Sequence, residues 1–325
     1  MDLEYLEIGL IGLIGNLKVM VKLKSQRDAY GEALLELAEK DERILALSPD
    51  LASSTRIEKL ASKLEENRFF NLGVAEQNAV GVAAGLAMEG FIPFLSSFAV
   101  FIPGRAFDQI RVSVCQNKAN VKLVGSHLGF SNAGDGATAQ SIEDLALMRT
   151  LPEMVVLSPA DASQVRSAVF AAAKHQGPVY IRISRDKTAP VDQQGQFVIG
   201  RAKILYPGKR ATLIATGPII SRLLDWVADL DIELINYTTI KPMDEKTLID
   251  SAKKTGRVIT VEEHSVIGGL GSAVSEILST SCPVPIKRIG IPDCFGQSAR
   301  KPEDLYKKYG LTKNAIKKEV LKFLK

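Results

Sequence analysis

The carboxylate of Glu76 stands at the head of a segment that is otherwise small and apolar. No charged residue lies between Glu76 and Glu89, so a helix formed there has no polar stripe, and we expect it to be buried on nearly every side. Burial disfavours an ionised carboxyl group unless a partner takes or shares its proton. Acidic residues are also common in the first turn of ordinary helices. The residues alone therefore leave both a chemical and a capping role open.

Short apolar runs alternate with helical segments on both sides of this helix. The predicted helices of the first part are 28–40, 55–65, 74–88, 104–117, 141–150 and 161–174. The predicted strands are 44–47, 91–94, 121–124, 154–157 and 179–183, followed later in the chain by 211–215, 233–236, 258–261 and 286–289. Apolar strands that alternate with helices indicate parallel sheets covered on both faces. The pattern predicts two doubly wound, mainly parallel α/β domains.

A chain of 325 residues is long enough for two such domains. We expect a first domain over 21–188, a linker over 189–200 that is polar and contains Gln and Pro, and a smaller domain over 201–325. We interpret residues 1–20 as an N-terminal lead, a segment before the first domain that forms either an extra strand or a disordered extension. Met20 is an alternative start, which would leave most of this lead untranslated.

Composition excludes several classes of protein. A hydrophobic content of 46% with 24% charged residues is that of a soluble globular protein. The net charge of +4 arises at the C-terminus, because residues 301–325 contain eight lysines and only three acidic residues. We interpret them as the solvated face of a helix, because no arginine or aromatic side chains are interleaved to read nucleic acid. The apolar run near the N-terminus is too short for a membrane span and has an acidic flank.

The three cysteines, Cys115, Cys282 and Cys294, are widely spaced and odd in number. This usage argues against a zinc site or a disulfide framework and indicates a reducing compartment, so we expect a cytoplasmic protein.

In parallel sheets, ligands bind beyond the carboxyl ends of the strands. Three loops rich in polar residues fall there, at 48–55, 96–98 and 125–136.

Several ordered motifs resemble those of transketolase over about residues 21–325. Residues 72–79 (Leu-Gly-Val-Ala-Glu-Gln-Asn-Ala), 97–111, 125–127 and 134–136 are similar to its pyrimidine-binding domain. Residues 261–273 and 288–296 are similar to its C-terminal domain. The resemblance implies thiamine diphosphate as cofactor and transfer of a two-carbon ketol group from a ketose phosphate to an aldose phosphate, as in the pentose phosphate pathway.

The resemblance implies that Glu76 meets N1′ of the cofactor's aminopyrimidine ring. A carboxyl group in a dry pocket there favours the imino tautomer, which can take the proton from the thiazolium carbon. Phe98 and Phe101 correspond to aromatic residues that pack against the pyrimidine, although either could belong to the ordinary core. Arg105 and Gln109 are further candidates for the same wall.

The resemblance also implies a site for the sugar phosphate. Its residues are Arg27, Ser54, His127, Asp135 and Arg185. Arginine and histidine suit a phosphate group, while Asp135 corresponds to a residue that binds a sugar hydroxyl. His127, like Glu76, is assigned a catalytic role. Two departures from the family pattern affect the pocket: Ala139 stands where relatives have histidine or glutamine, and the segment between Phe101 and Arg105 is one residue longer.

One motif of the whole enzyme is missing. The Gly-Asp-Gly of residues 134–136 looks like the family's diphosphate motif, but the asparagine that should follow soon after first occurs as Asn236, 101 residues beyond Asp135. The diphosphate and its Mg²⁺, an ion that requires oxygen ligands, must then be held by a separate N-terminal subunit. We expect a heteromer with two copies of each chain and active sites between chains. Gly81 and Gly85 would let another helix approach closely.

Two other interpretations remain open from the sequence. The chain could be half of a related thiamine enzyme, either similar to deoxyxylulose-phosphate synthase or to the β subunit of a 2-oxoacid dehydrogenase. Arg27, Ser54 and Arg185 argue against the dehydrogenase, because a 2-oxoacid needs no clamp for a sugar phosphate. The chain could also be a non-catalytic assembly subunit, which Ala139 supports best.

Overall fold

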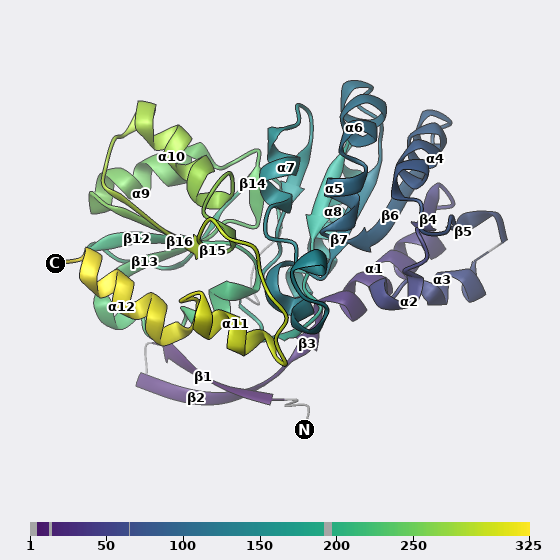
Figure 1. Ribbon diagram of the computed structural model, residues 1–325. Helices are drawn as coiled ribbons and strands as arrows, with labels where there is room; N and C mark the ends of the chain where they lie inside the picture. Colours follow the sequence, from purple (N-terminus) through teal and green to yellow (C-terminus); the bar gives the residue numbers. More distant parts are fainter. Residues whose placement is uncertain (1–4, 13–14, 65, 192–196) are drawn as a thin grey trace.

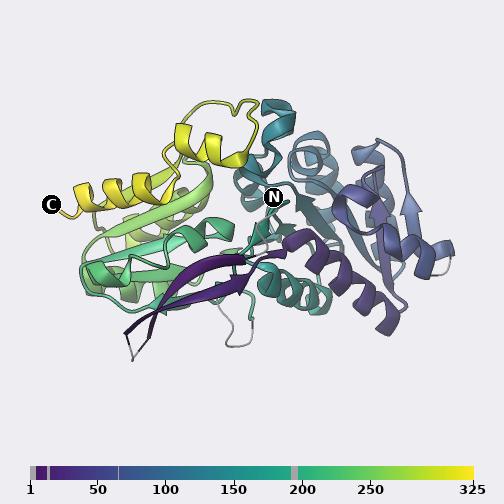
Figure 2. The same cartoon turned by 90° about the horizontal axis from the view of Figure 1, so that it is seen from below.

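The computed structural model describes residues 5–12, 15–64, 66–191 and 197–325. The prediction of two mainly parallel α/β domains is confirmed: two twisted sheets lie side by side, each covered by helices (Figure 1). The predicted lead and linker fall partly outside the described residues. Within the lead, β1 (Tyr5–Gly12) and β2 (Gly15–Lys22) pair as an antiparallel hairpin that lies along the second domain (Figure 2).

The first sheet has seven strands in the order β14-β8-β9-β7-β6-β4-β5. Its strands are β4 (Ile44–Ser48), β5 (Phe69–Asn71), β6 (Ile92–Phe98), β7 (Lys122–Ser126), β8 (Val155–Leu157), β9 (Val179–Arg182) and β14 (Thr239–Lys241). All pairs are parallel except that of β14, which joins the edge antiparallel to β8. Since β14 comes from the second half of the chain, the sheet ties the two halves together.

Helices cover both faces of this sheet. They are α1 (Gln26–Lys40), α2 (Ala52–Thr55), α3 (Glu58–Lys63), α4 (Glu76–Met88), α5 (Phe101–Arg105), α6 (Phe107–Gln109), the π-helix η2 (Ile110–Gln116), α7 (Asp144–Thr150) and α8 (Ala162–Lys174), with short 3₁₀ turns η1 (Glu66–Arg68), η3 (Gly129–Asp135) and η4 (Ala137–Ala139). Alternate residues of β4 explain the two layers: Ile44 and Ala46 face α1 and α8, whereas Leu45 and Leu47 face α4.

The second sheet has five strands in the order β11-β13-β12-β15-β16. The strands are β11 (Lys203–Tyr206), β12 (Ala211–Ala215), β13 (Ile232–Asn236), β15 (Val258–Ser265) and β16 (Ile286–Ile291); the helices are α9 (Glu245–Thr255), α10 (Leu270–Ser281), α11 (Pro302–Lys308) and α12 (Lys313–Phe323), with turns η5 (Gly217–Arg222) and η6 (Ala228–Leu230). The two-stranded pair β3 (Lys24–Ser25) and β10 (Lys187–Thr188) completes the fold. One buried apolar cluster runs from α4 through α7 to α10, so the domains share a core.

Two predicted helices are broken. The segment 104–117 is divided into α5, α6 and η2, and the segment 55–65 into α2 and α3. Arg56, in left-handed conformation with φ of 68°, ends α2 and accounts for the second break. These breaks lie beyond the carboxyl ends of β6 and β4, where the chain must turn to present side chains to a ligand.

Candidate functional site

Glu76 is the first residue of α4, and its side chain is only 3% exposed. Arg105, at the end of α5, lies against it: Nη1 donates a hydrogen bond of 2.9 Å to Oε1 of Glu76. The Arg105 side chain is itself 48% exposed, so the pair sits where buried protein meets the surface. A second contact fixes the same corner, because Gln77 donates its side-chain amide to the Arg105 carbonyl at 3.0 Å.

The expectation that α4 is buried on nearly every side is wrong for the chain as it stands. Its inner face is buried at residues such as Ala79 and Ala83, but Asn78, Gly81 and Gly85 are exposed. The absence of charge therefore reflects an outer face of uncharged, mostly small residues, rather than a face packed within this chain.

A row of aromatic rings leads away from the carboxylate. The guanidinium of Arg105 lies 4.0 Å from the ring centroid of Phe101, and the Phe101 ring stacks on Phe98 at 5.5 Å and 18°. The Phe98 ring in turn lies 3.9 Å from the imidazole of His127. At the end of α6, which follows α5 in the chain, Oε1 of Gln109 is buried and has no hydrogen-bond partner among the described residues.

The imidazole of His127 is neutral. Burial lowers its pKa to about 3, and the positive charges of Arg27, Arg185 and Arg56 lower it further. Its Nδ1 shares a hydrogen bond of 2.9 Å with Ser126 Oγ. The backbone at His127 has φ of 63°, a conformation that turns the chain sharply after β7 and directs the residue over the strand ends.

Three arginines gather on the far side of His127. The pKa of Arg27 is lowered by burial and then by the charges of Arg56 and Arg185, so the three cations lie within electrostatic reach of one another. Arg27 donates to the Ser54 carbonyl at 2.8 Å. Such a concentration of guanidinium groups suits an anion with several oxygens.

The arginine cluster is only partly balanced by nearby acids. Arg56 pairs with Asp28 at 3.0 Å. Burial raises the pKa of Asp186 from its ordinary value, and the charges of Arg185 and Arg27 oppose that rise. Arg185 is held by uncharged groups: Nη1 donates to Asn132 Oδ1 at 3.5 Å and its backbone N–H to Ser131 Oγ at 3.4 Å.

Asp135 and Ser54, two of the residues predicted to bind the sugar phosphate, do not direct their side chains to the arginine cluster through any hydrogen bond among the described residues. Asp135 is exposed, and among the described residues no hydrogen bond or ion pair joins it to the arginine cluster. Ser54 contributes its backbone carbonyl to Arg27. Ala139 is 7% exposed, and the neighbouring side chain of Gln140 turns away to donate to the Gln297 carbonyl at 2.8 Å.

Sequence reasoning missed several residues of this site. Arg56 directly follows the polar loop 48–55, and Asp186 directly follows Arg185, so adjacency was an available signal. Asn132 and Ser131 lie in the glycine-rich loop after His127. Nothing in the local sequence indicates which of that loop's polar side chains would reach Arg185.

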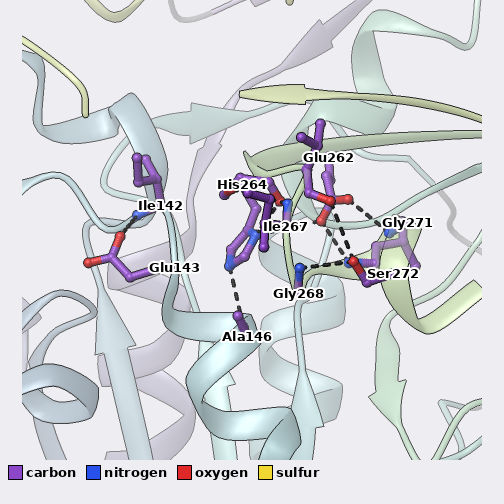
Figure 3. Close-up of polar contacts among 12 residues, drawn as sticks. Ile142, Glu143, Ala146, Glu262, His264, Ile267, Gly268, Gly271 and Ser272 are labelled. Carbon is purple, nitrogen blue, oxygen red and sulfur yellow. Dashed lines mark hydrogen bonds and ion pairs between the residues drawn. The ribbon is translucent and has the colours of Figure 1, made fainter. Parts of the chain in front are cut away.

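The end of β15 joins the second domain to this region. His264 is fully buried and accepts a hydrogen bond from Ala146 N, in the first turn of α7, at Nε2 (3.4 Å), while its Nδ1–H donates to the Ser265 carbonyl (2.8 Å; Figure 3). Burial lowers the pKa of His264 to about 4. Glu262 accepts the N–H groups of Leu270 and Gly271 at the start of α10. These groups have structural partners and do not face the arginine cluster.

The residues at the Glu76 end fit a planar heterocycle with a basic nitrogen. A nearly buried carboxylate can share a proton with such a nitrogen, and the stacked Phe98 and Phe101 rings offer an aromatic wall. The oxygen of Gln109, buried and unpartnered among the described residues, is a further candidate acceptor. The site as a whole thus has a heterocycle end and an anion end, joined by His127.

Comparisons with known proteins point to one family. Residues 23–190 match "Transketolase, pyrimidine binding domain" and residues 200–316 match "Transketolase, C-terminal domain". The chain is 42% identical over 304 residues to "6-deoxy-6-sulfo-D-fructose transketolase subunit SqwH" of Clostridium sp. (strain MSTE9), covering 91% of this chain and 94% of that protein. It is also 42% identical over 319 residues to "Putative transketolase C-terminal section" of Methanocaldococcus jannaschii, covering 94% and 99%.

A solved structure shares the fold. The protein described as "Split gene transketolase, inactive beta4 tetramer" superposes with a TM-score of 0.85 and 45% sequence identity, covering 92% of this chain and 98% of that one. In the part of the chain that the structure describes, no helix has the length and apolar character needed to cross a membrane.

Proposed function

Because the chain belongs to the transketolase family and consists of its pyrimidine-binding and C-terminal domains, we propose that it transfers a two-carbon ketol group from a ketose phosphate to an aldose phosphate. One observation carries this proposal: an unbroken row of contacts leads from the buried Glu76 carboxylate through the Arg105 guanidinium and then the Phe101 and Phe98 rings to His127. The arginines lie beyond His127. A cofactor end and a phosphate end are what such a transfer requires. We place the reaction in pentose phosphate recycling in the cytoplasm.

Glu76, Phe98, Phe101 and Arg105 are the residues that would hold the pyrimidine end of thiamine diphosphate. When bound, that cofactor supplies the nucleophilic carbon for cleavage and formation of the carbon–carbon bond. Glu76 contributes a carboxylate oxygen that shares a proton with the ring nitrogen, which its burial makes more effective than in water. Arg105 neutralises the ionised form of Glu76 and closes the aromatic wall from the surface side.

His127 and the arginine cluster would bind the sugar phosphate. Because the imidazole stays neutral, it offers a hydrogen bond to a substrate oxygen without adding to the positive charge. Arg27 and Arg185 supply that charge. Among the described residues, the Arg185 guanidinium donates only through Nη1, to Asn132, so its other N–H groups can reach the anion. Asp135 would bind a sugar hydroxyl from the exposed edge of the loop.

A second chain would complete the site. This sequence lacks the family's diphosphate motif, so an N-terminal transketolase subunit would hold the diphosphate and Mg²⁺. The similar split-gene transketolase of known structure is an inactive β₄ tetramer, which supports the requirement for another subunit. The exposed face of α4 is a suitable contact surface, because a Cβ atom at Gly81 or Gly85 would meet no atom of the described residues within 4 Å. We propose a heterotetramer with two copies of each chain.

The test is reconstitution. The chain is purified alone and with an N-terminal subunit, and ketol transfer from xylulose 5-phosphate to ribose 5-phosphate is measured with thiamine diphosphate and Mg²⁺. We expect activity only in the mixture. Glu76→Gln should lower kcat by about 100-fold or more, as expected for loss of a general acid–base group. Glu89→Gln, which changes an exposed carboxylate at the other end of α4, is the matched control.

Two results would contradict the proposal. Activity of the purified chain without a partner would remove the split site. Unchanged activity of Glu76→Gln in the mixture would remove the role of this carboxylate. The same assay run with a sulfonated ketose separates the reaction of the sulfofructose relative from the one proposed here.

A further inference from the structure

The loop of residues 127–140, called the site loop below, is wedged between the two domains. Its backbone is held from the second domain by Glu263, at the end of β15, whose Oε1 accepts a hydrogen bond of 2.7 Å from Phe130 N. The other carboxylate oxygen, Oε2, accepts a hydrogen bond of 2.8 Å from the Tyr306 hydroxyl on α11. Glu263 is 3% exposed. A buried carboxylate with a donor on each oxygen is held in one orientation.

The site loop is shaped to receive this carboxylate. Gly129 has φ of 51°, and a Cβ atom there would lie 2.3 Å from Oε1 of Glu263. Any other residue would therefore be strained and would displace the carboxylate. Further contacts from the second domain hold the same loop: Ala299 N donates to the Ala133 carbonyl at 3.0 Å, and the Phe130 ring stacks on Tyr309 at 4.9 Å.

The same loop controls both halves of the anion site. His127 begins it, three positions before Phe130, and Ser131 and Asn132, which hold Arg185, follow Phe130 directly. Phe130 N is thus the backbone donor that lies between the imidazole and the residues that position the guanidinium. A shift of this peptide would move both groups that face the substrate anion.

We propose that Glu263 is a positioning residue through which the second domain sets the geometry of the sugar-phosphate site. The inference rests on the proposed function for the identity of the anion, but the loop geometry does not depend on it. Glu263 touches no substrate. It acts through Phe130 N on the site loop, and through the loop on His127 and Arg185. The second domain thereby has a role in substrate binding in addition to its structural one.

Glu262 provides the matched control. It is the preceding residue on β15, is also fully buried, and also accepts two hydrogen bonds. Both of its donors, Leu270 N and Gly271 N, belong to the second domain. Burial raises the pKa of each of the two carboxyl groups to about 7, so they are similar in ionisation as well as in location. Glu262→Ala and Glu263→Ala should both reduce stability, but only the second change reaches the site loop.

The first measurement uses the chain alone and needs no activity. Amide hydrogen exchange is followed by mass spectrometry in peptides that cover residues 127–135. Glu263→Ala should speed exchange there by about tenfold or more, the factor expected for loss of one charge-assisted hydrogen bond. Glu262→Ala should leave these peptides within about twofold of wild type and speed exchange at the start of α10. Equal exchange in the site loop of both variants would overturn the proposal.

The second measurement uses the reconstituted enzyme. Glu263→Ala should raise KM for the phosphorylated donor by about tenfold, and it should change KM for an unphosphorylated ketol donor far less. Glu263→Gln should restore most of the loss, because its oxygen can accept from Phe130 N while its amide donates to the Tyr306 oxygen. Equal effects on both donors, or the same KM change in Glu262→Ala, would show a merely structural role.

A third variant covers the case in which Glu263→Ala does not fold. Tyr306→Phe removes one donor and leaves Phe130 N in place, so it should produce smaller changes in the same direction in both measurements. No change in either would contradict the proposal. If the wild-type mixture lacks ketol transfer, the proposed function fails, whereas the exchange measurement still decides whether Glu263 holds the site loop.

Discussion

The ring of Phe98 lies 3.9 Å, centroid to centroid, from the imidazole of His127. The register of two neighbouring strands accounts for this contact: Phe98 is the last residue of β6, Ser126 is the last residue of β7, and the two are paired. His127 follows with its left-handed backbone and turns over the strand end. One pair of parallel strands therefore sets the distance between the aromatic wall and the anion site.

Phe98→Leu should weaken binding of thiamine diphosphate. The change keeps apolar bulk but removes the stacked contact with Phe101 and the ring contact with His127. An aromatic pair is worth about 0.5–1.5 kcal/mol beyond its buried area, so we expect the cofactor concentration at half-maximal activity to rise by about 2- to 10-fold. The titration is carried out on the reconstituted enzyme.

The control for this prediction is Phe170→Leu. Phe170 lies on α8, on the opposite face of the sheet, under Arg166 at 4.8 Å. Phe170→Leu removes the contact between this ring and the Arg166 guanidinium, and Phe170 lies outside the candidate site. An equal rise in both variants would mean that the effect of Phe98→Leu comes from general destabilisation.

The fold was predictable because its signals are local. Strands such as β4, β8 and β12 are buried on both faces and consist almost entirely of apolar residues. β5 (Phe-Phe-Asn) and β14 (Thr-Ile-Lys) were missed because each is short and includes polar residues, whereas the equally short β8 (Val-Val-Leu) is wholly apolar. β14 also pairs with the sheet of the other domain, a contact that no local pattern encodes.

The site was predictable only in part, for a related reason. The family motifs led to Glu76, the phenylalanines, His127 and the arginines, and family membership is confirmed. Their individual roles stay predictions. Glu263 could not be found this way, because its partner Phe130 is 133 positions away. The sequence of α4 also does not show whether an uncharged helix is buried within its own chain or exposes one face that another chain can cover.

Gly81→Leu should leave the chain folded and prevent its assembly. A Cβ atom at Gly81 would meet no atom within 4 Å in the part of the chain that the structure describes. Replacing a helical glycine favours the helix by about 0.5–1 kcal/mol. The thermal midpoint of the chain should therefore hold or rise. Association with the N-terminal subunit, measured by analytical ultracentrifugation, should weaken by at least about tenfold, because the added side chain blocks close approach of another helix.

Ser167→Leu is the matched control for this prediction. Ser167 is exposed on α8, which covers the other face of the sheet, so the same side chain is added to a helix away from the proposed interface. Assembly of Gly81→Leu at wild-type affinity would place the partner on another surface of the chain.

His264→Gln should change how stability depends on pH. The pKa of His264 falls from its ordinary 6.5 to about 4 on folding, because burial disfavours the imidazolium. Between these values the unfolded chain binds a proton that the folded chain does not, so the stability contributed by neutral His264 is present above pH 6.5 and lost as the pH falls toward 4. This loss amounts to about 3 kcal/mol. Glutamine does not titrate, and its oxygen can accept from Ala146 N.

We therefore expect the wild-type advantage in unfolding free energy over His264→Gln, measured by urea denaturation, to shrink by about 3 kcal/mol between pH 7 and pH 4. His127 titrates in both proteins and cancels from the comparison. His175→Gln is the control, because burial also lowers the pKa of His175 but its side chain is less enclosed, so its difference from wild type should vary less with pH. A constant difference between wild type and His264→Gln across this range would mean that His264 is not held neutral between the two domains.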